Sequence, residues 1–177
     1  SIFPTHCVQT IQDLFTAVSE TSAVVIDVEG NPITRVSQPS LVYQLLQTTA
    51  AGRETCSRAW KSIAIQAQEE SAVLPTYGNL HCIAAGIFHQ DQKKGVFLAG
   101  EFFTSSMTSA KSARELKALG FSPEEINSTL EKVPLVTEKQ MKKIIRQPAA
   151  ASRAIESILI ERGAFIDRLQ RISSLTK

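Results

Sequence analysis

Residues Ala23–Val36 read AVVIDVEGNPITRV, and this stretch decides the fold class. β-Branched residues crowd its first half, Gly30 and Asn31 provide a turn, and a second run starts at Pro32. Two such runs around a glycine-containing turn predict a β-hairpin. A hairpin that follows a helix, and is followed by further helix and strand, suits a small α+β sensor module better than a catalytic scaffold.

Helical patterns lie on both sides of this hairpin. Apolar residues recur at helical spacing between positions 5 and 19, which predicts an amphipathic helix packed against the hairpin. These apolar positions are Val8, Ile11, Leu14, Phe15 and Val18. A second helical pattern covers residues 41–70 and is interrupted near Ala51–Arg53.

Further strands are expected between residues 71 and 103. The stretch Ser71–Tyr77 contains Pro75, so it should form a loop or an edge strand. The apolar runs Leu80–Phe88 and Gly95–Phe103 flank a polar turn, and we expect them to pair antiparallel. The sequence therefore predicts a mainly antiparallel sheet flanked by helices, in the α+β class.

The remainder of the chain is expected to be helical. Residues 109–119 form one short helix, and Ser122–Glu125 and Thr137–Gln140 carry the residues that begin two more. These segments are helix starts and not catalytic motifs. A long helix should then occupy residues 149–175.

This last helix has two interpretations. Its apolar residues recur at alternating steps of three and four, which is typical of a coiled coil. Those residues are Ile155, Ile158, Phe165, Leu169 and Ile172, with Arg162 as a polar interruption. The helix either packs on its own domain or forms a homodimer seam that carries a signal onward. We therefore divide the chain into a sensory part, residues 1–148, and a C-terminal signalling helix, residues 149–177, which either belongs to the same domain or forms the dimer seam.

Composition limits the functions that the chain can have. With 177 residues and 43% apolar content it can bury one substantial core. The net charge of +2 is spread along the chain, so we expect no nucleic-acid or membrane-surface partner. No apolar stretch approaches the roughly 20 residues that cross a bilayer. We expect a soluble, cytoplasmic fragment of a longer protein, with its three cysteines reduced.

Small residues at the middle of the two central strands mark the most plausible place for a pocket. Ala84, Ala85, Gly86, Ala99 and Gly100 would either admit a closely packed helix or leave space for a ligand. Beside them, Glu101 places a carboxylate in an apolar strand, which is costly to bury without a partner. On the inner face it would bind a ligand or a proton, and on the outer face it would be ordinary surface.

Four more residues complete the candidate ligand site. Tyr77 and Trp60 could line a pocket and donate hydrogen bonds, although core packing is the ordinary role for Trp60. Cys82 and the more distant Cys56 could also contribute to it. Together with His81 these cysteines are also candidate metal ligands, but adjacent strand residues face opposite sides of a sheet. We expect no cofactor and no catalytic residue, because the sequence carries no nucleotide, hydrolase or calcium motif.

The order of these segments resembles the PocR sensory domain over nearly the whole chain. The segments that carry the resemblance are IQDLF at 11–15, AVVIDVEGNPIT at 23–34, AGRETC at 51–56, Tyr77–Gly86, GVFLAGEFF at 95–103 and KVPLV at 132–136. The resemblance implies a PAS-like sensor of prokaryotic histidine kinases, diguanylate cyclases and transcription regulators. It also implies a small ligand, of the class of short hydrocarbon derivatives such as diols.

The chain departs from the usual family pattern at three places. Leu41–Val42 stand where a Phe-Cys pair is usual, and Gly100–Glu101 stand where Gly-Gln is usual. Ile83 and Ala84 replace a Cys-His pair when the strand glycine is kept in register, whereas Cys56 keeps its family position. The ligand chemistry usual for the family therefore does not carry over directly to these positions.

Three functions remain open from the sequence. The first is a non-enzymatic ligand-sensing domain of a bacterial regulator, read out through the C-terminal helix. The second is a degenerate sensor that has become a dimerisation or docking module. The third is a metal- or haem-dependent redox sensor.

Overall fold

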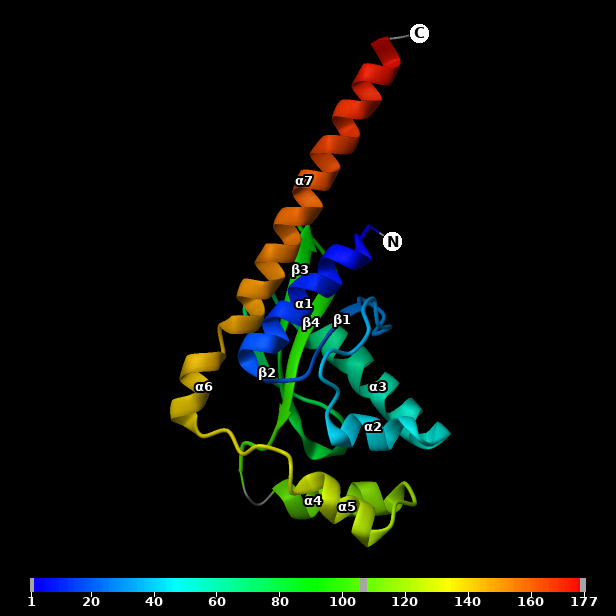
Figure 1. The fold of residues 1–177 in the computed structure, drawn as a ribbon, viewed down its shortest axis with the longest axis vertical. Helices are drawn as coiled ribbons and strands as arrows, with labels where there is room; N and C mark the ends of the chain where they lie inside the picture. The colour runs from blue at the N-terminus through cyan, green and yellow to red at the C-terminus, as the bar shows by residue number, and fades with distance from the viewer. Residues whose placement is uncertain (1, 106–107, 176–177) are drawn as a thin grey trace.

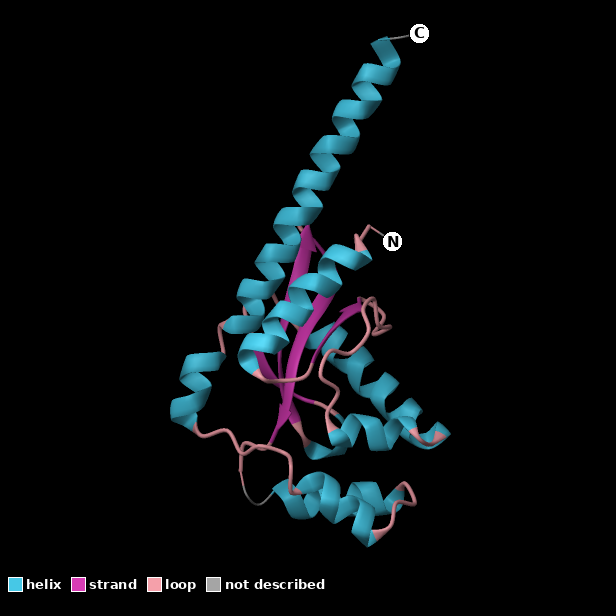
Figure 2. Ribbon diagram, in the orientation of Figure 1, coloured by secondary structure: helices cyan, strands magenta, loops and turns pink. Residues whose placement is uncertain are grey.

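The structure, a computed structural model, describes residues 2–105 and 108–175 of the chain. Within these residues four strands form one antiparallel sheet, which Figures 1 and 2 show between helices. In spatial order the strands are β1 (Ala23–Asp27), β4 (Gln92–Phe102), β3 (His81–His89) and β2 (Ala72–Pro75). The predicted α+β class, with an antiparallel sheet flanked by helices and a C-terminal helix, is confirmed.

The two faces of the sheet belong to different hydrophobic clusters. On one face, Val25 and Phe97 pack with Ile155 of α7 (Gln147–Leu175), beside α1 (Thr5–Ser19). On the other face, Val24 packs with Trp60 of α3 (Ala50–Gln66). Because neighbouring residues of a strand point to opposite faces, the continuous apolar run of β1 contributes to both clusters.

The predicted hairpin is only half formed. The chain reverses after β1, but the returning segment is not a strand and makes isolated bridges to Ala23 and Ile26. Strand β1 pairs with β4 instead, and Val25 lies opposite Phe97. On the edge of β1 away from β4, backbone hydrogen bonds join Ala23 to Ser37 and the N–H of Ile33 to the carbonyl of Val25. Between them the N–H of Val25 donates to the side chain of Thr34 at 2.9 Å, so one side-chain acceptor interrupts the backbone pairing that a regular second strand would make.

Helix α1 has the predicted bounds but a different buried face. Gln12 and Thr16 are buried, whereas Leu14 is 64% and Val18 is 87% exposed. The side-chain amide of Gln12 donates to the carbonyl of Ala23 at 3.0 Å. The helix is therefore fixed to β1 by a polar contact as well as by apolar packing, and part of its apolar stripe faces solvent.

The helices after the first strand start at local capping signals. Helix α2 (Leu41–Gln47) is followed by α3, and the hydroxyl of Thr49 accepts from the N–H of Gly52 at 3.0 Å. The break between them therefore lies slightly before the predicted interruption. The short 3-10 helix η1 (Tyr77–Asn79) follows β2, which is the edge strand that Pro75 led us to expect.

Three short helices occupy the segment between β4 and α7. They are α4 (Thr108–Ala118), α5 (Pro123–Leu130) and α6 (Glu138–Ile144). Both predicted capping boxes are present, from Ser122 to Glu125 and from Thr137 to Gln140. Helix α6 buries none of its residues, so its position depends on the segments on either side of it.

The long helix α7 combines a packed half with a projecting half. Ile155 and Leu159 are buried against the sheet, whereas Phe165 is 61% and Leu169 is 50% exposed. Figure 1 shows the red end of α7 extending well beyond the sheet. The first half therefore packs on its own domain, and the second half leaves its apolar side chains without cover in the single chain. None of the helices within residues 2–105 and 108–175 combines the length and apolar character that crossing a bilayer requires.

Candidate functional site

A β-bulge lies near the end of β4. Two residues of β4, Gly100 and Glu101, lie opposite one residue of β3, Cys82. Gly100 has φ +85°, a left-handed conformation that glycine adopts without steric cost, as in the G1 type of bulge. Its N–H donates to the carbonyl of Ser22 at 2.7 Å. A bulge changes the direction of the side chain that follows it, and here that side chain is Glu101.

The carboxyl group of Glu101 is held by two hydroxyl groups. The hydroxyls of Ser40 and Tyr77 each donate a hydrogen bond to it. Ser40 is the N-cap of α2 and Tyr77 lies in η1. Two segments that are distant from each other in the sequence therefore meet at Glu101. Burial raises the pKa of Glu101 to about 8, and the Ser40 hydrogen bond acts in the opposite direction. Both of its hydrogen-bond partners are uncharged hydroxyl groups.

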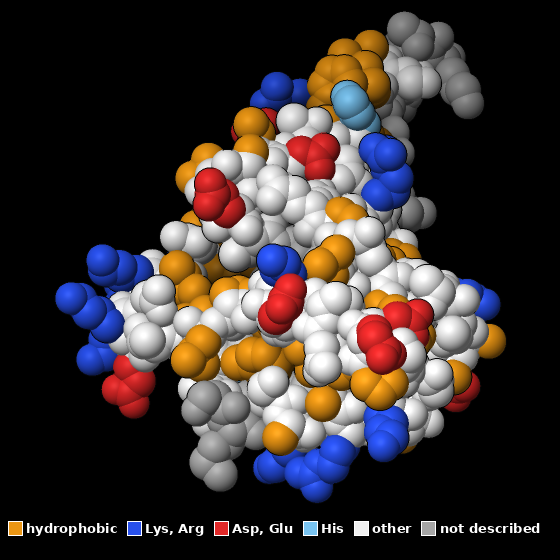
Figure 3. Space-filling view, turned by 60° about the horizontal axis from the view of Figure 1, so that its bottom comes forward, with side chains coloured by type: hydrophobic (Ala, Val, Ile, Leu, Met, Phe, Trp, Pro, Cys, Tyr) orange, Lys and Arg blue, Asp and Glu red, His pale blue; other side chains and the backbone are white. Residues whose placement is uncertain are grey.

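A cavity of about 220 Å³ opens beside this bulge, and we name it the bulge cavity. Residues of β4 and β3 form its floor, and the end of α1, the end of α6 and the first residues of α7 contribute to its walls. It is lined by Phe15, Ser19, Glu20, Thr21, Ser22, Gln38, Ser40, Ile83, Ala99, Gly100, Glu101, Phe102, Lys132, Pro134, Val136, Ile144, Gln147 and Pro148. Figure 3 shows hydrophobic side chains gathered around a hollow on the face that its view brings forward.

A second and much smaller cavity lies on the α3 side of Glu101. This aromatic cavity has a volume of about 20 Å³, enough for roughly one water molecule. Trp60, Tyr77, Cys82 and Glu101 all line it, so the structure brings together four of the five predicted ligand residues. Tyr43 also lines this cavity and stacks on Trp60 with ring centroids 5.9 Å apart.

Cys56, the fifth predicted residue, lies in the core behind this site. It belongs to the cluster that contains Tyr77, and it does not line either of the two cavities. Burial raises the pKa of the Cys56 thiol to about 12, and the nearby charge of Glu101 adds to this effect. Burial also raises the pKa of the Cys82 thiol to about 12. Both thiols are uncharged at neutral pH, which suits packing better than nucleophilic chemistry.

The described residues form no evident metal centre. No group of three or more His, Cys, Asp or Glu side chains that could hold a metal ion occurs in residues 2–105 and 108–175. Cys82 and Cys56 lie in different hydrophobic clusters. The pKa of His81 is lowered by burial, so its imidazole is neutral at neutral pH.

The small residues of the central strands have two different roles. Ala84 is fully buried against the α3 side, and the N–H of Gly86 donates to the carbonyl of Gln68 at 2.6 Å. At these two positions neighbouring segments pack closely on the strand, which is the close-packing alternative that the small residues left open. Ala99 and Gly100, in contrast, line the bulge cavity.

Several residues of the site carried no recognisable signal in the sequence. Ser40 is the N-cap of α2, and its hydroxyl also bonds a carboxyl group 61 positions away. Gln38, Ile144 and Gln147 reach the cavity only because distant segments meet there. The one available signal was Gly100, because an isolated glycine inside a strand often marks a bulge.

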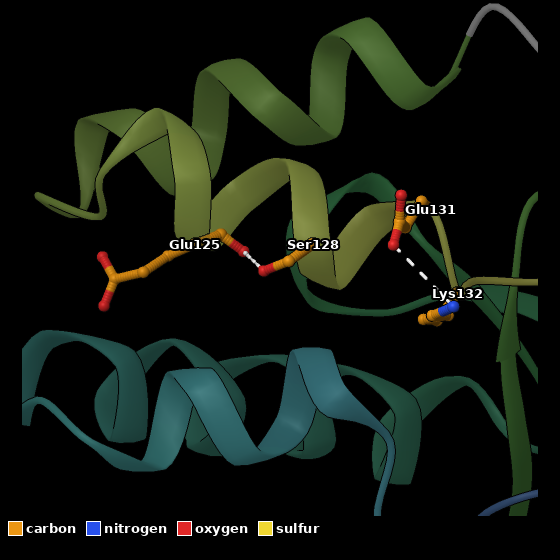
Figure 4. Close-up of polar contacts among 4 residues, drawn as sticks. All are labelled: Glu125, Ser128, Glu131 and Lys132. Atoms are coloured by element: carbon orange, nitrogen blue, oxygen red, sulfur yellow. Dashed lines mark hydrogen bonds and ion pairs between the residues drawn. The ribbon is translucent and has the colours of Figure 1, made fainter.

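Three charged side chains line the bulge cavity. Two are the carboxylates Glu20 and Glu101, and the third is Lys132. Figure 4 shows Lys132 directed toward Glu131, with Nζ and Oε1 3.8 Å apart, and both side chains are well exposed. The same view shows the hydroxyl of Ser128 donating to the backbone carbonyl of Glu125 at 3.1 Å within α5. Lys132 is therefore a solvated cation at the rim of the cavity.

The chain matches a known family along most of its length. A family model described as the sensory domain found in PocR covers residues 1–157. The match includes every segment that forms the bulge cavity, and it ends within the packed half of α7. Neither a curated protein nor a solved structure matches the chain.

Proposed function

The chain belongs to the family of PocR sensory domains, and we propose that it senses a small molecule for a bacterial signal-transduction or transcription regulator. The ligand binds in the bulge cavity, between the sheet and the helices. Its presence is read out through α7. We assign no catalytic role to this part of the protein.

One observation carries this proposal. The bulge cavity is lined at the same time by Gly100 and Glu101 of the sheet and by Gln147 and Pro148 at the start of α7. A ligand in this place contacts both the recognition surface and the helix that leaves the domain. It can shift the helix only if it binds one helix position more tightly than another, and contact with α7 provides that difference.

The beginning of α7 is attached to the sheet by few polar contacts. The N–H of Ala149 donates to the hydroxyl of Ser71 at 2.8 Å, and the hydroxyl of Ser152 donates to the carbonyl of Ala85 at 3.2 Å. Helix α6, which precedes α7, has no buried residues. A small movement of α6 around a ligand therefore disrupts little buried packing, and α6 can transmit this movement to the start of α7.

We propose a homodimer in which the projecting half of α7 pairs with a second copy. Phe165 and Leu169 are exposed on that half, and a separate apolar groove lies between α1 and the start of α7. Exposed apolar surface of this kind is typical of an interface. The division into a sensory part, residues 1–148, and a signalling helix, residues 149–177, belongs to the same proposal.

The proposed setting is the cytoplasm, with neither a nucleic acid nor a membrane as partner of this domain. The three free cysteines support a reducing compartment, since Cys56 and Cys82 are buried and unpaired with each other. The low and dispersed net charge supports the absence of a nucleic-acid partner.

A docking module is the second candidate, because the aromatic cavity, where four predicted ligand residues meet, is nearly filled. If the bulge cavity also fails to bind small molecules, the domain acts through its surfaces alone. No observation favours a metal- or haem-dependent redox sensor over these two.

Thermal melting with a probe panel separates the first two candidates. We would add short alcohols, diols, alkylamines and carboxylic acids at millimolar concentration, since a ligand of the folded state raises the melting temperature. The variant Val136→Phe places a ring at the rim of the bulge cavity, and Ile65→Phe adds the same ring on the exposed face of α3. Sensing predicts a shift in the wild type and in Ile65→Phe that is lost in Val136→Phe. No shift with any probe would favour the docking module.

A further inference from the structure

Glu101 is a carboxyl group without a cationic partner. Among the described residues, no Lys, Arg or His nitrogen lies within the 4.0 Å of an ion pair from it. A buried carboxylate is costly unless a positive charge or several hydrogen bonds compensate it. Ser40 and Tyr77 provide two hydrogen bonds and no charge. When Glu101 is ionised, the site therefore lacks a compensating positive charge.

The remaining wall of the bulge cavity is suited to a short hydrocarbon chain. Phe15, Ile83, Phe102, Val136 and Ile144 give it an apolar lining. A volume of about 220 Å³ is smaller than the pockets that accept drug-sized ligands, so the occupant must be small.

Polar acceptors gather at the Glu101 side of this cavity. Gln38 donates through Nε2 to the carbonyl of Thr16 at 3.1 Å, which leaves its Oε1 to accept a hydrogen bond. Ser40 lines the same cavity. An ammonium group donates up to three hydrogen bonds and accepts none, so a carboxylate and an amide oxygen match its needs.

We propose that the bulge cavity binds a small organic cation, whose ammonium group pairs with the carboxylate of Glu101 while its alkyl chain lies against the apolar wall. This inference rests on the proposed sensing function and names the class of its ligand. The charges of the lining agree with this proposal, because the lining contains two carboxyl groups, Glu20 and Glu101, and one cation at the rim, Lys132. A carboxylate ligand would instead be repelled by Glu101.

Other titratable groups lie close to Glu101 on several elements. Tyr77 lies on η1, Tyr43 on α2 and Cys56 on α3, and Glu20 and Lys132 line the cavity. The pKa values of Tyr43 and Cys56 are raised by burial and by the charge of Glu101, so both groups are uncharged below pH 9. Glu101 itself is then the group whose ionisation changes most within the cavity between pH 6 and pH 9.

The test is calorimetric titration of the whole chain with three probes of equal chain length, n-butylammonium, n-butanol and butyrate. An alkylammonium stays charged up to about pH 10, as lysine does. Because Glu101 must lose its proton to pair with it, and its pKa is about 8, affinity should rise roughly 100-fold from pH 6 to pH 9. The affinity for n-butanol should show no such rise.

Two variants locate the effect. Glu101→Gln removes the charge and keeps the shape, and it should abolish both the preference for n-butylammonium and the pH dependence. Glu20→Gln removes the other carboxylate of the cavity and should change the affinity by less than about threefold. Circular dichroism of both variants confirms that they are folded.

Each contrary result has a distinct meaning. Binding of n-butanol that equals or exceeds that of n-butylammonium at pH 9 would overturn the cation assignment and leave the sensing function in place. Cation binding that survives Glu101→Gln would overturn it as well. Binding of none of the three probes overturns the cation assignment, and the wider probe panel with Val136→Phe then decides separately whether the cavity senses anything.

Discussion

The phenol of Tyr77 donates a hydrogen bond to the carboxyl group of Glu101, and this contact joins η1 to the bulge of β4. It places an aromatic ring and an ionisable group at the boundary between the two cavities. Ser40 makes the matching contact from α2. The site therefore depends on the bulge, on the buried charge and on two hydroxyl donors, and each can be altered separately.

The conformation of the bulge is tested by Gly100→Ala. Gly100 has φ +85°, and an added Cβ would lie 3.0 Å from the ring of Phe102. We expect the free energy of unfolding to fall by about 1–2 kcal/mol or more. Urea denaturation followed by circular dichroism measures this. Gly163→Ala is the control, because it lies inside α7 with nothing within 4 Å and should gain about 0.5–1 kcal/mol. Equal effects of the two substitutions would argue against a strained position at Gly100.

The partly buried carboxyl group of Glu101 gives the protein a defined pH dependence. The folded-state pKa of Glu101 is raised from 4.5 to about 8, so the folded chain keeps a proton that the unfolded chain has lost. The stability that this proton provides is fully present below pH 4.5 and is lost as the pH rises toward 8. We expect Glu101 to lower the free energy of unfolding by about 1–3 kcal/mol across this window, after allowance for solvent screening.

Glu101→Gln should remove this slope, so that the variant becomes more stable than the wild type above neutral pH. Chemical denaturation at several pH values measures the difference. Glu54→Gln, on the exposed surface of α3, should leave the wild-type slope unchanged. A wild-type slope that persists in Glu101→Gln would show that another group causes it.

The hydroxyl of Tyr77 is tested by Tyr77→Phe. The substitution removes one of the two donors to Glu101 and leaves a partly buried acceptor with one partner fewer. We expect a loss of about 1–3 kcal/mol in the free energy of unfolding. Tyr43→Phe removes a phenol for which no hydrogen bond is found among the described residues, and it should cost less than about 0.5 kcal/mol. If both substitutions cost the same, the contact with Glu101 contributes little.

The projecting half of α7 is tested by introducing charge. Phe165→Lys together with Leu169→Lys should convert a dimer into a monomer without loss of the sheet core, because both side chains are exposed in the single chain. Analytical ultracentrifugation gives the mass, and circular dichroism checks the fold. Asp167→Lys introduces the same residue about half a turn away on α7 and should leave the mass unchanged. A wild type that sediments as a monomer at high concentration would contradict the proposed homodimer.

Local signals in the sequence were enough to predict most of the elements. The apolar spacing of residues 5–19 gave the bounds of α1, and Ser122 and Thr137 marked the starts of α5 and α6. These features depend on residues within one or two turns of one another. The paired strands β3 and β4 were predictable for the same reason, since one short turn joins them.

The site was less predictable because it depends on contacts between distant segments. The segment after β1 was expected to be its partner strand, but it makes only isolated bridges to β1, and the regular partner of β1 is the distant strand β4. Ser40 and Glu101 meet across 61 positions, which no periodic pattern records. The sequence pointed to Glu101 as an unusual carboxylate, but it could not distinguish Ala84 and Gly86, where neighbouring segments pack closely, from Ala99 and Gly100, which line the bulge cavity.

The most direct measurement is a two-dimensional ¹H–¹⁵N NMR titration of the chain with the probe panel. If the bulge cavity binds the ligand and α7 reads it out, the amide signals of Gly100 and Gln147 should shift together and saturate. The signals of Ser152 and Ile155, farther along α7, should shift at the same concentrations. Saturable shifts confined to other surfaces, or shifts at Gly100 that leave every α7 signal in place, would contradict this mechanism.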